Sequence, residues 1–203
     1  MTVPAWSPVR AVRETREGVD LDAAERAAAQ FLEALGIGLD SEGMRGTPGR
    51  MARAYAELFT PRTFNLTTFP NDEGYDELVL ARAIPVVSVC EHHLLPFSGV
   101  AHVGYLPGER ILGLSKLAWV VEQFARRPQV QERLTVQIAG WLAERLRPKG
   151  VGVVIEAEHT CMTLRGVQAA GSTTVTSTLL GVLREDARSR QEFFALTGAT
   201  PRT

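Results

Sequence analysis

The chain has 203 residues, of which 45% are hydrophobic and 22% charged, and 22 Lys and Arg against 23 Asp and Glu give a formal net charge of −1. These values exclude a disordered, collagen-like or coiled-coil chain, and they argue against a general binder of nucleic acid or membrane surfaces. The N-terminal residues contain no apolar run of signal-peptide length, and no segment approaches the ~18 uninterrupted apolar residues of a membrane span. With only two cysteines, the chain lacks a disulfide framework, and a reducing, cytoplasmic setting is expected.

The N-terminal part predicts an arm followed by helices. Residues 1–19 are polar and predict a flexible arm, whereas residues 20–60 predict a helical segment. Its first helix is expected to begin at Asp22, which can act as the N-cap. A second helix is expected at Thr47-Pro48, with Thr as the cap and Pro in the first turn.

The residues from 61 to 203 change to strand periodicity and predict a second, larger unit. Strands are expected at residues 78–89, 99–106, 151–161 and 171–181. Two helices, capped by Ser115 and opened by Pro128, are expected between the second and third strands, and a last helix near Glu185. This order predicts an α+β fold with an antiparallel sheet.

Both cysteines and three of the four histidines lie in two short motifs, Cys90-Glu91-His92-His93 and His159-Thr160-Cys161. Cys90 and His93 are three residues apart, a spacing that can direct both at one metal ion from a turn. His159 and Cys161 are two apart on an expected strand, and would therefore point the same way.

Thiolate and imidazole are ligands that Zn²⁺ prefers, and a site with two cysteines and one histidine leaves one position for water. Zinc lowers the pKa of such a water to about 7, and the unused histidines would then act as an acid–base pair. A closed structural site, with His92 or His159 as the fourth ligand, is the main alternative. An inert pair of buried cysteines is another, and His102, which has no partner in sequence, is expected to be structural.

Basic residues from separate segments form a second feature: Arg50, Arg53, Lys116 and Arg165. They would make a phosphate pocket if the fold brings them together, and Ser115-Lys116 opens a helix whose free amides suit an anion. Glu132, beside Gln131 in the first turn of its helix, could accept hydrogen bonds from a guanine-type base. The alternative is that these residues are ordinary solvated charges.

Taken together, the segments CEHHLLPF, GLSKL, RPQVQERLT, HTCMTLRGV and TVTSTLLGVLRED resemble GTP cyclohydrolase I, in order, from about residue 22 to 197. The resemblance implies the tunnelling fold, an antiparallel four-stranded sheet with helices packed on one side, preceded by an N-terminal helical segment. Residues 61–203 would form the catalytic domain. It also implies a homo-oligomer, a decamer with active sites between subunits, and no nucleic-acid or membrane partner.

The resemblance implies that the chain hydrolyses GTP at C8 of the guanine, releases formate and forms 7,8-dihydroneopterin triphosphate for folate or tetrahydrobiopterin synthesis. One zinc ion per subunit would be held by Cys90, His93 and Cys161. The implied catalytic residues are His92, His159, Ser115, Gln131 and Glu132. The implied substrate contacts are Arg50, Arg53, Ser115, Lys116, Gln131, Glu132 and Arg165.

Two positions depart from the family pattern. Trp119 stands where members usually have Arg, and Thr173 stands where many have Lys. The first change removes one expected triphosphate contact. Two other functions therefore stay open, a divergent enzyme of the same fold acting on a related purine nucleotide and a non-catalytic, zinc-stabilised assembly protein.

Overall fold

The computed structural model describes residues 18–198, so most of the predicted arm, residues 1–19, lies outside the described residues. The chain divides into two compact units, one ending at Thr60 and the other beginning at Pro61. Within residues 18–198, no helix combines the length and the apolar character that crossing a membrane requires.

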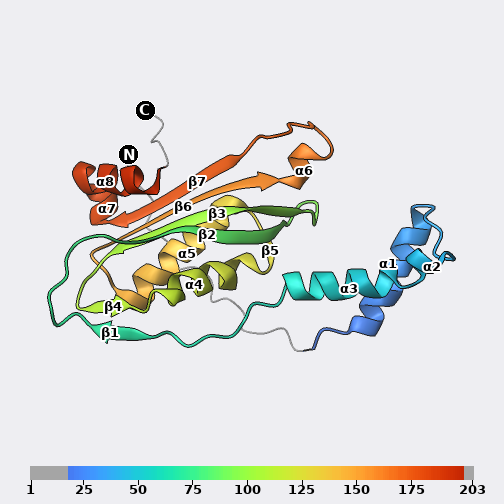
Figure 1. Cartoon of the computed structure of the whole chain (residues 1–203), viewed down its shortest axis with the longest axis horizontal. Coiled ribbons are helices and arrows are strands. Elements are labelled where there is room, and N and C mark those ends of the chain that lie inside the picture. Colours follow the sequence, from blue (N-terminus) through green and yellow to red (C-terminus); the bar gives the residue numbers. More distant parts are fainter. Residues whose placement is uncertain (1–17, 199–203) are drawn as a thin grey trace, which may run out of the picture. The chain divides into compact units, whose positions relative to one another are not determined.

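The N-terminal unit contains three helices: α1 (Leu21–Ala34), α2 (Glu42–Arg45) and α3 (Thr47–Leu58) (Figure 1). Asp20, not the expected Asp22, caps α1, because its extended backbone lets its carboxylate accept from the Ala23 N–H at 2.9 Å. Thr47 is the first residue of α3 and not its cap, while Pro48 occupies the first turn as predicted.

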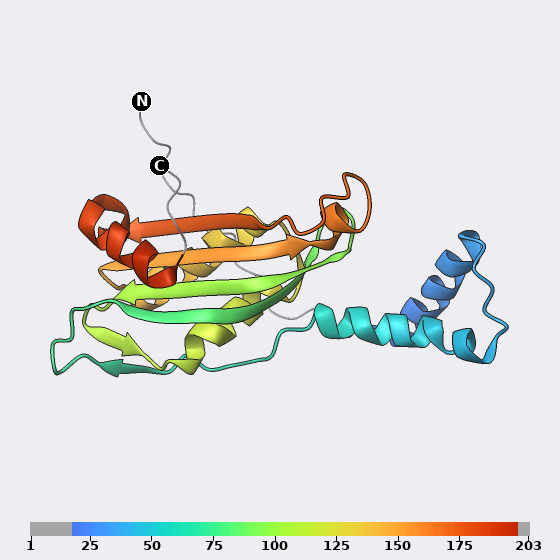
Figure 2. The ribbon, with the colours of Figure 1, turned by 45° about the horizontal axis from the view of Figure 1, so that its top comes forward.

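A five-stranded sheet, in the order β5-β2-β3-β6-β7, is the centre of the second unit (Figures 1 and 2). Its four antiparallel strands are β2 (Val79–Cys90), β3 (Pro96–Leu106), β6 (Gly150–His159) and β7 (Thr174–Gly181). They confirm the predicted four-stranded antiparallel sheet. The two-residue strand β5 (Pro128–Gln129) adds a parallel edge beside the end of β2, so Pro128 lies in a strand and does not open a helix. A separate ribbon pairs β1 (Thr68–Pro70) with β4 (Arg110–Leu112).

The two long helices α4 (Ser115–Ala125) and α5 (Gln131–Leu146) cover one face of this sheet (Figure 2). Ile155 of β6 pairs with Thr176 of β7, whose hydroxyl lies 3.1 Å from the Gln131 amide nitrogen of α5. Alternate residues of β6 share this face with Ile155, and they are fully buried with Leu117, Val121, Leu134 and Ile138 of the two helices. This layer is the main core.

The other face of the sheet is covered near one end only, by α7 (Val182–Glu185) and α8 (Ala187–Thr197) (Figure 2). Phe193, Leu183 and Val154 form a second buried cluster there. Gly152 permits this packing, because a Cβ atom at that position would lie 2.7 Å from the Phe193 ring. The structure therefore adds this smaller layer to the helices expected on one side.

Sheet topology decides which segments can meet. Strands β2 and β6 flank β3 and are both antiparallel to it, so both strands stop at the same end of the sheet. Cys90 is the last residue of β2 and His159 the last of β6. The two Cys/His motifs are therefore neighbours, while β4 and the start of α4 lie at the opposite end of the sheet (Figure 1).

Candidate active site

Cys90, His93 and Cys161 come together where β2 and β6 end. Their ligand atoms all lie within 4.8 Å of one another, and the Cys90 Sγ is 3.8 Å from the His93 Nδ1. Both cysteines are buried free thiols. Zinc bonds to sulfur at about 2.3 Å and to nitrogen at about 2.0 Å, so two donor atoms bound to one ion lie a few ångströms apart, as these atoms do. The donor set and its spacing fit a zinc ion.

A tight turn after β2 produces this geometry. The Leu94 N–H donates to the Cys90 carbonyl at 2.8 Å, and the Cys90 N–H donates to the Leu95 carbonyl at 2.9 Å. Leu94 has a positive φ of 53°, which a non-glycine residue adopts only where its surroundings require it. The turn folds His93 back beside Cys90, as the three-residue spacing predicted.

Cys161 reaches the group by a different route from the one predicted. Strand β6 ends at His159, and Cys161 lies in the one-turn helix α6 (Thr160–Thr163). The Thr160 hydroxyl donates to the Pro96 carbonyl at 2.5 Å and ties α6 to the start of β3. Because the chain turns after His159, His159 and Cys161 do not share a strand face, and His159 lies outside the ligand group found among the described residues.

The electrostatics of the two thiols favour a bound cation. Burial raises the pKa of the Cys161 thiol, and the neighbouring Cys90 raises it further, while Arg165 acts in the opposite direction. Two thiolates this close repel each other, and a divalent ion removes that repulsion because metal binding displaces the thiol protons.

His159 is held on two sides. Its ring stacks on Phe97, with the centroids 4.4 Å apart and the planes 12° apart, and its Nε2 lies 2.7 Å from the Gln131 Oε1. Burial lowers the pKa of His159, and the charge of the nearby Glu132 opposes that effect. The structure thus places a pre-oriented imidazole and a carboxylate next to the candidate metal group.

Gln131 is 2% exposed, and protein groups occupy its side chain. Its Nε2 lies near three acceptors, the Ile155 carbonyl at 3.1 Å, the Thr174 carbonyl at 2.9 Å and the Thr176 hydroxyl at 3.1 Å. Because its Oε1 also contacts His159, both ends of the Gln131 amide are hydrogen-bonded to protein groups within the site.

The other predicted residues at this end of the sheet are exposed. The His92 side chain is 65% exposed, with its Nδ1 3.9 Å from the Cys90 Sγ. Glu132 and Arg165 are also exposed, and they are close enough to His159 and Cys161, respectively, to influence their pKa values. One end of the domain therefore carries the predicted metal ligands, both candidate histidines, the candidate base-binding carboxylate and one candidate phosphate ligand.

Sequence reasoning missed the residues that brace this end. Arg133 pairs with the Glu91 carboxylate and donates from Nε to the Gln129 Oε1 at 2.9 Å. The hydrogen bond from Arg133 holds the pKa of the Glu91 carboxyl below its usual value. This pair links the ligand turn to the start of α5. The only signal for this ion pair in the sequence is that Glu91 lies in the segment CEHHLLPF and Arg133 in the segment RPQVQERLT.

Ser115 and Lys116 lie away from the metal group. The Ser88 hydroxyl near the end of β2 donates to the Ala125 carbonyl at the last residue of α4, at 2.6 Å. The first residue of α4, Ser115, is therefore a helix length away from Cys90. Ser115 does not cap α4 as expected, because the chain enters the helix through a turn in which the Lys116 N–H donates to the Gly113 carbonyl at 2.8 Å.

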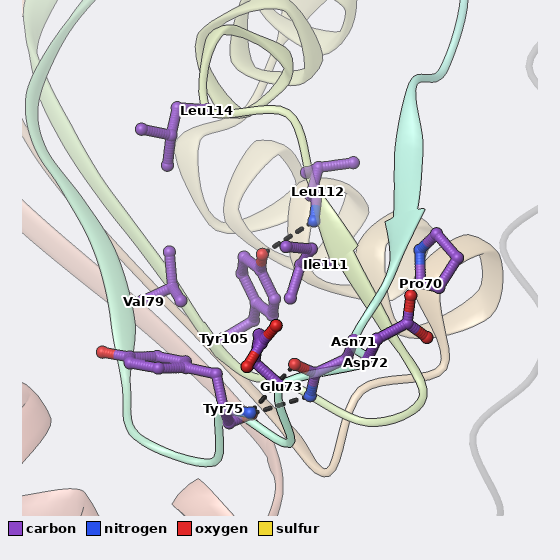
Figure 3. A pocket seen from close by; sticks show the side chains of 10 residues that line it. All are labelled: Pro70, Asn71, Asp72, Glu73, Tyr75, Val79, Tyr105, Ile111, Leu112 and Leu114. Atoms are coloured by element: carbon purple, nitrogen blue, oxygen red, sulfur yellow. Dashed lines mark hydrogen bonds between the residues drawn. The ribbon is translucent and has the colours of Figure 1, made fainter.

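A cavity of about 360 Å³ lies beside this start of α4 (Figure 3). The Tyr105 hydroxyl accepts from the Leu112 N–H at 2.8 Å within it, and Leu114 at its wall is 71% exposed. Lys116 extends over the Trp119 ring, with Nζ 5.3 Å from the centroid. Trp119, where the resemblance led us to expect Arg, thus holds Lys116 by a cation–π contact.

Arg50 and Arg53 are on α3 of the N-terminal unit, where the Arg50 Nη2 donates to the Gly43 carbonyl at 2.7 Å. Thr173, where the resemblance led us to expect Lys, directly precedes β7 and donates from its hydroxyl to the Glu156 carboxylate at 3.0 Å.

Comparisons with known proteins found related sequences. Residues 24–198 match the sequence model of the GTP cyclohydrolase I family. A protein of Aquifex aeolicus named GTP cyclohydrolase 1 is 50% identical over 178 residues, which cover 88% of this chain and 97% of the relative. Proteins with the same name from Mycobacteroides abscessus and Corynebacterium glutamicum are 53% and 50% identical over 180 and 193 residues, covering 85% and 92% of this chain and 87% and 95% of the relatives.

Proposed function

The chain belongs to the GTP cyclohydrolase I family, and on this basis we propose that it opens the guanine imidazole ring of GTP at C8. Formate leaves, and the product is 7,8-dihydroneopterin triphosphate, a precursor for folate or tetrahydrobiopterin synthesis in the cytoplasm. The observation that carries the proposal is the group of Cys90, His93 and Cys161 beside the oriented His159.

Cys90, His93 and Cys161 would hold one zinc ion per subunit. When bound, the ion would supply Lewis acidity and lower the pKa of a water in its remaining position. Neither His92 nor His159 joins the ligand group found among residues 18–198, which favours a catalytic site with a free position over a closed structural one.

The chain's own residues would then bind and protonate the substrate. Glu132 would accept hydrogen bonds from N1–H and the 2-amino group of guanine. His159 would exchange a proton with the imidazole part of the base, and the exposed His92 would contact the ribose or a water. Phosphate oxygens would be bound by Arg165, by Ser115 and Lys116 at the start of α4, and by Arg50 and Arg53 of α3.

We expect the base contact to decide which nucleotide is used. Inosine triphosphate lacks the 2-amino group, so it should lower kcat/KM by about 10- to 100-fold relative to GTP, the effect of one hydrogen bond to a charged group. A Glu132→Gln variant should lose most of this preference. Steady-state kinetics with the two nucleotides measure both effects, and Glu158→Gln, a nearby exposed carboxylate on β6, is the control. A wild-type preference for inosine triphosphate would instead favour the divergent purine-nucleotide enzyme.

The phosphate half of the site is incomplete within one domain. Helix α4 has 11 residues, so its first residue lies roughly 15 Å from its last, which packs beside β2 near Cys90. Ser115 and Lys116 therefore do not reach the metal group of their own subunit. We propose that they complete the site of a neighbouring subunit in a homo-oligomer, with the decamer implied by the family resemblance as the expected assembly.

Mixing variants tests this arrangement. His159→Ala and Lys116→Ala alter opposite halves, so each should have low activity alone, whereas co-expressed, differently tagged subunits purified as mixed oligomers should regain part of it. Mixed oligomers of His159→Ala and Glu132→Ala subunits carry both changes in the same half of the site, so they should regain no activity. Mixed oligomers of the first pair that show no recovery would contradict a site shared between subunits.

A further inference from the structure

A chain of hydrogen bonds fixes the position of one proton on His159. It begins with Thr135 of α5, which is 1% exposed and donates its single hydroxyl proton to the Gln131 carbonyl at 2.7 Å. The oxygen atoms of Thr135 and Thr176 are 2.7 Å apart. Because the Thr135 proton is already used, the Thr176 hydroxyl must be the donor in this contact.

The same reasoning about donors and acceptors fixes the orientation of the Gln131 amide. Having donated to Thr135, the Thr176 hydroxyl can only accept from the Gln131 side chain, 3.1 Å away. The carbonyls of Ile155 and Thr174 can only accept as well. Three acceptors therefore surround one end of the Gln131 amide, so that end is the NH₂ group and the opposite end, facing His159, is the oxygen.

An amide oxygen can only accept, so the His159 Nε2, 2.7 Å away, must carry a hydrogen. The stack on Phe97 prevents the ring from turning over freely. Nδ1 has no hydrogen-bond partner among residues 18–198. In the neutral ring, this nitrogen holds the lone pair.

We propose that Thr135, Thr176 and Gln131 are positioning residues that fix the Nε2–H form of His159 and leave the Nδ1 lone pair free to contact the substrate. No proton moves along the threonine chain. The contact of Nδ1 with the substrate rests on the proposed function, whereas the proton position on the free protein does not.

Substitutions of similar shape test the positioning role. Gln131→Met should lower kcat on the order of 10²-fold, the lower range for loss of an oriented acid–base group, with KM changed by less than about threefold. Thr176→Val should lower kcat about tenfold, since two carbonyls still orient Gln131, and Thr176→Ser, which keeps the hydroxyl, should restore it. Thr178→Val, on the same strand and face, is the control and should leave kcat unchanged. Equal effects of Thr176→Val and Thr178→Val would overturn the role of this hydroxyl.

The proton itself can be observed. Solid-state NMR of the zinc-loaded oligomer with ring-¹⁵N histidine, assigned with a His159→Gln variant, should show a protonated Nε2 and an unprotonated Nδ1 when the ring is neutral. A protonated Nδ1 in the neutral ring would overturn the inference. This spectrum does not depend on turnover, so a wild-type protein that fails to convert GTP would refute the proposed function while the spectrum still decides the tautomer.

Discussion

Replacement of Cys161 by alanine is expected to abolish metal binding and GTP turnover together. The ligand group contains two thiols and one imidazole, and removal of one thiol leaves two protein ligands, too few for a zinc site of this kind. The zinc content of the purified protein, measured by mass spectrometry, should fall from one ion per chain to near zero. The rate of formate release should fall with it.

Met162→Leu is the matched control for this substitution. Met162 is the next residue of the same one-turn helix, is 38% exposed and offers no ligand to the group. This variant should keep both zinc and activity. A Cys161→Ala protein that retains zinc and turns over GTP at the wild-type rate would show that the Cys/His group does not hold the catalytic metal.

The second large effect is expected at His159. His159→Ala should lower kcat by about 10²- to 10⁴-fold, the range for loss of a positioned acid–base group, while zinc stays bound. Zinc should stay because the ring lies outside the ligand group and is held by Phe97 and Gln131. Kinetics and metal analysis on the same preparation measure both quantities.

His102→Gln is the control for a histidine outside the site. His102 pairs with Val154 across strands β3 and β6, and the Val154 side chain belongs to the cluster on the sheet face away from α5. Burial lowers the pKa of His102, as it does that of His159. Loss of zinc in His159→Ala would contradict our account, because it would make His159 a fourth ligand and the metal site a closed, structural one.

Local patterns were sufficient to predict much of the fold. The alternating pattern at 151–161 predicted β6, and the apolar spacing after Gln131 predicted α5. The proximity of Cys90 and His93 was also predictable, because a turn brings these two residues together whatever the rest of the chain does. Local residue chemistry determines each of these features.

Features that depend on tertiary contacts were not predictable. Cys161 was assigned to a strand, but the contact of Thr160 with Pro96 ends the strand two residues earlier and turns the chain into α6. Thr135 and Thr176 are 41 residues apart and meet only through the packing of α5 on β7, so no spacing rule identifies their link to His159. The bracing of the ligand turn by Arg133 has the same origin.

Formate release from GTP is the most direct test of the proposed activity. Zinc-loaded protein incubated with GTP should release formate in equal amount to a pterin product, followed by its absorbance and fluorescence. A chelator should stop both, and added zinc should restore both. Protein that holds zinc but releases no formate from GTP would contradict the account.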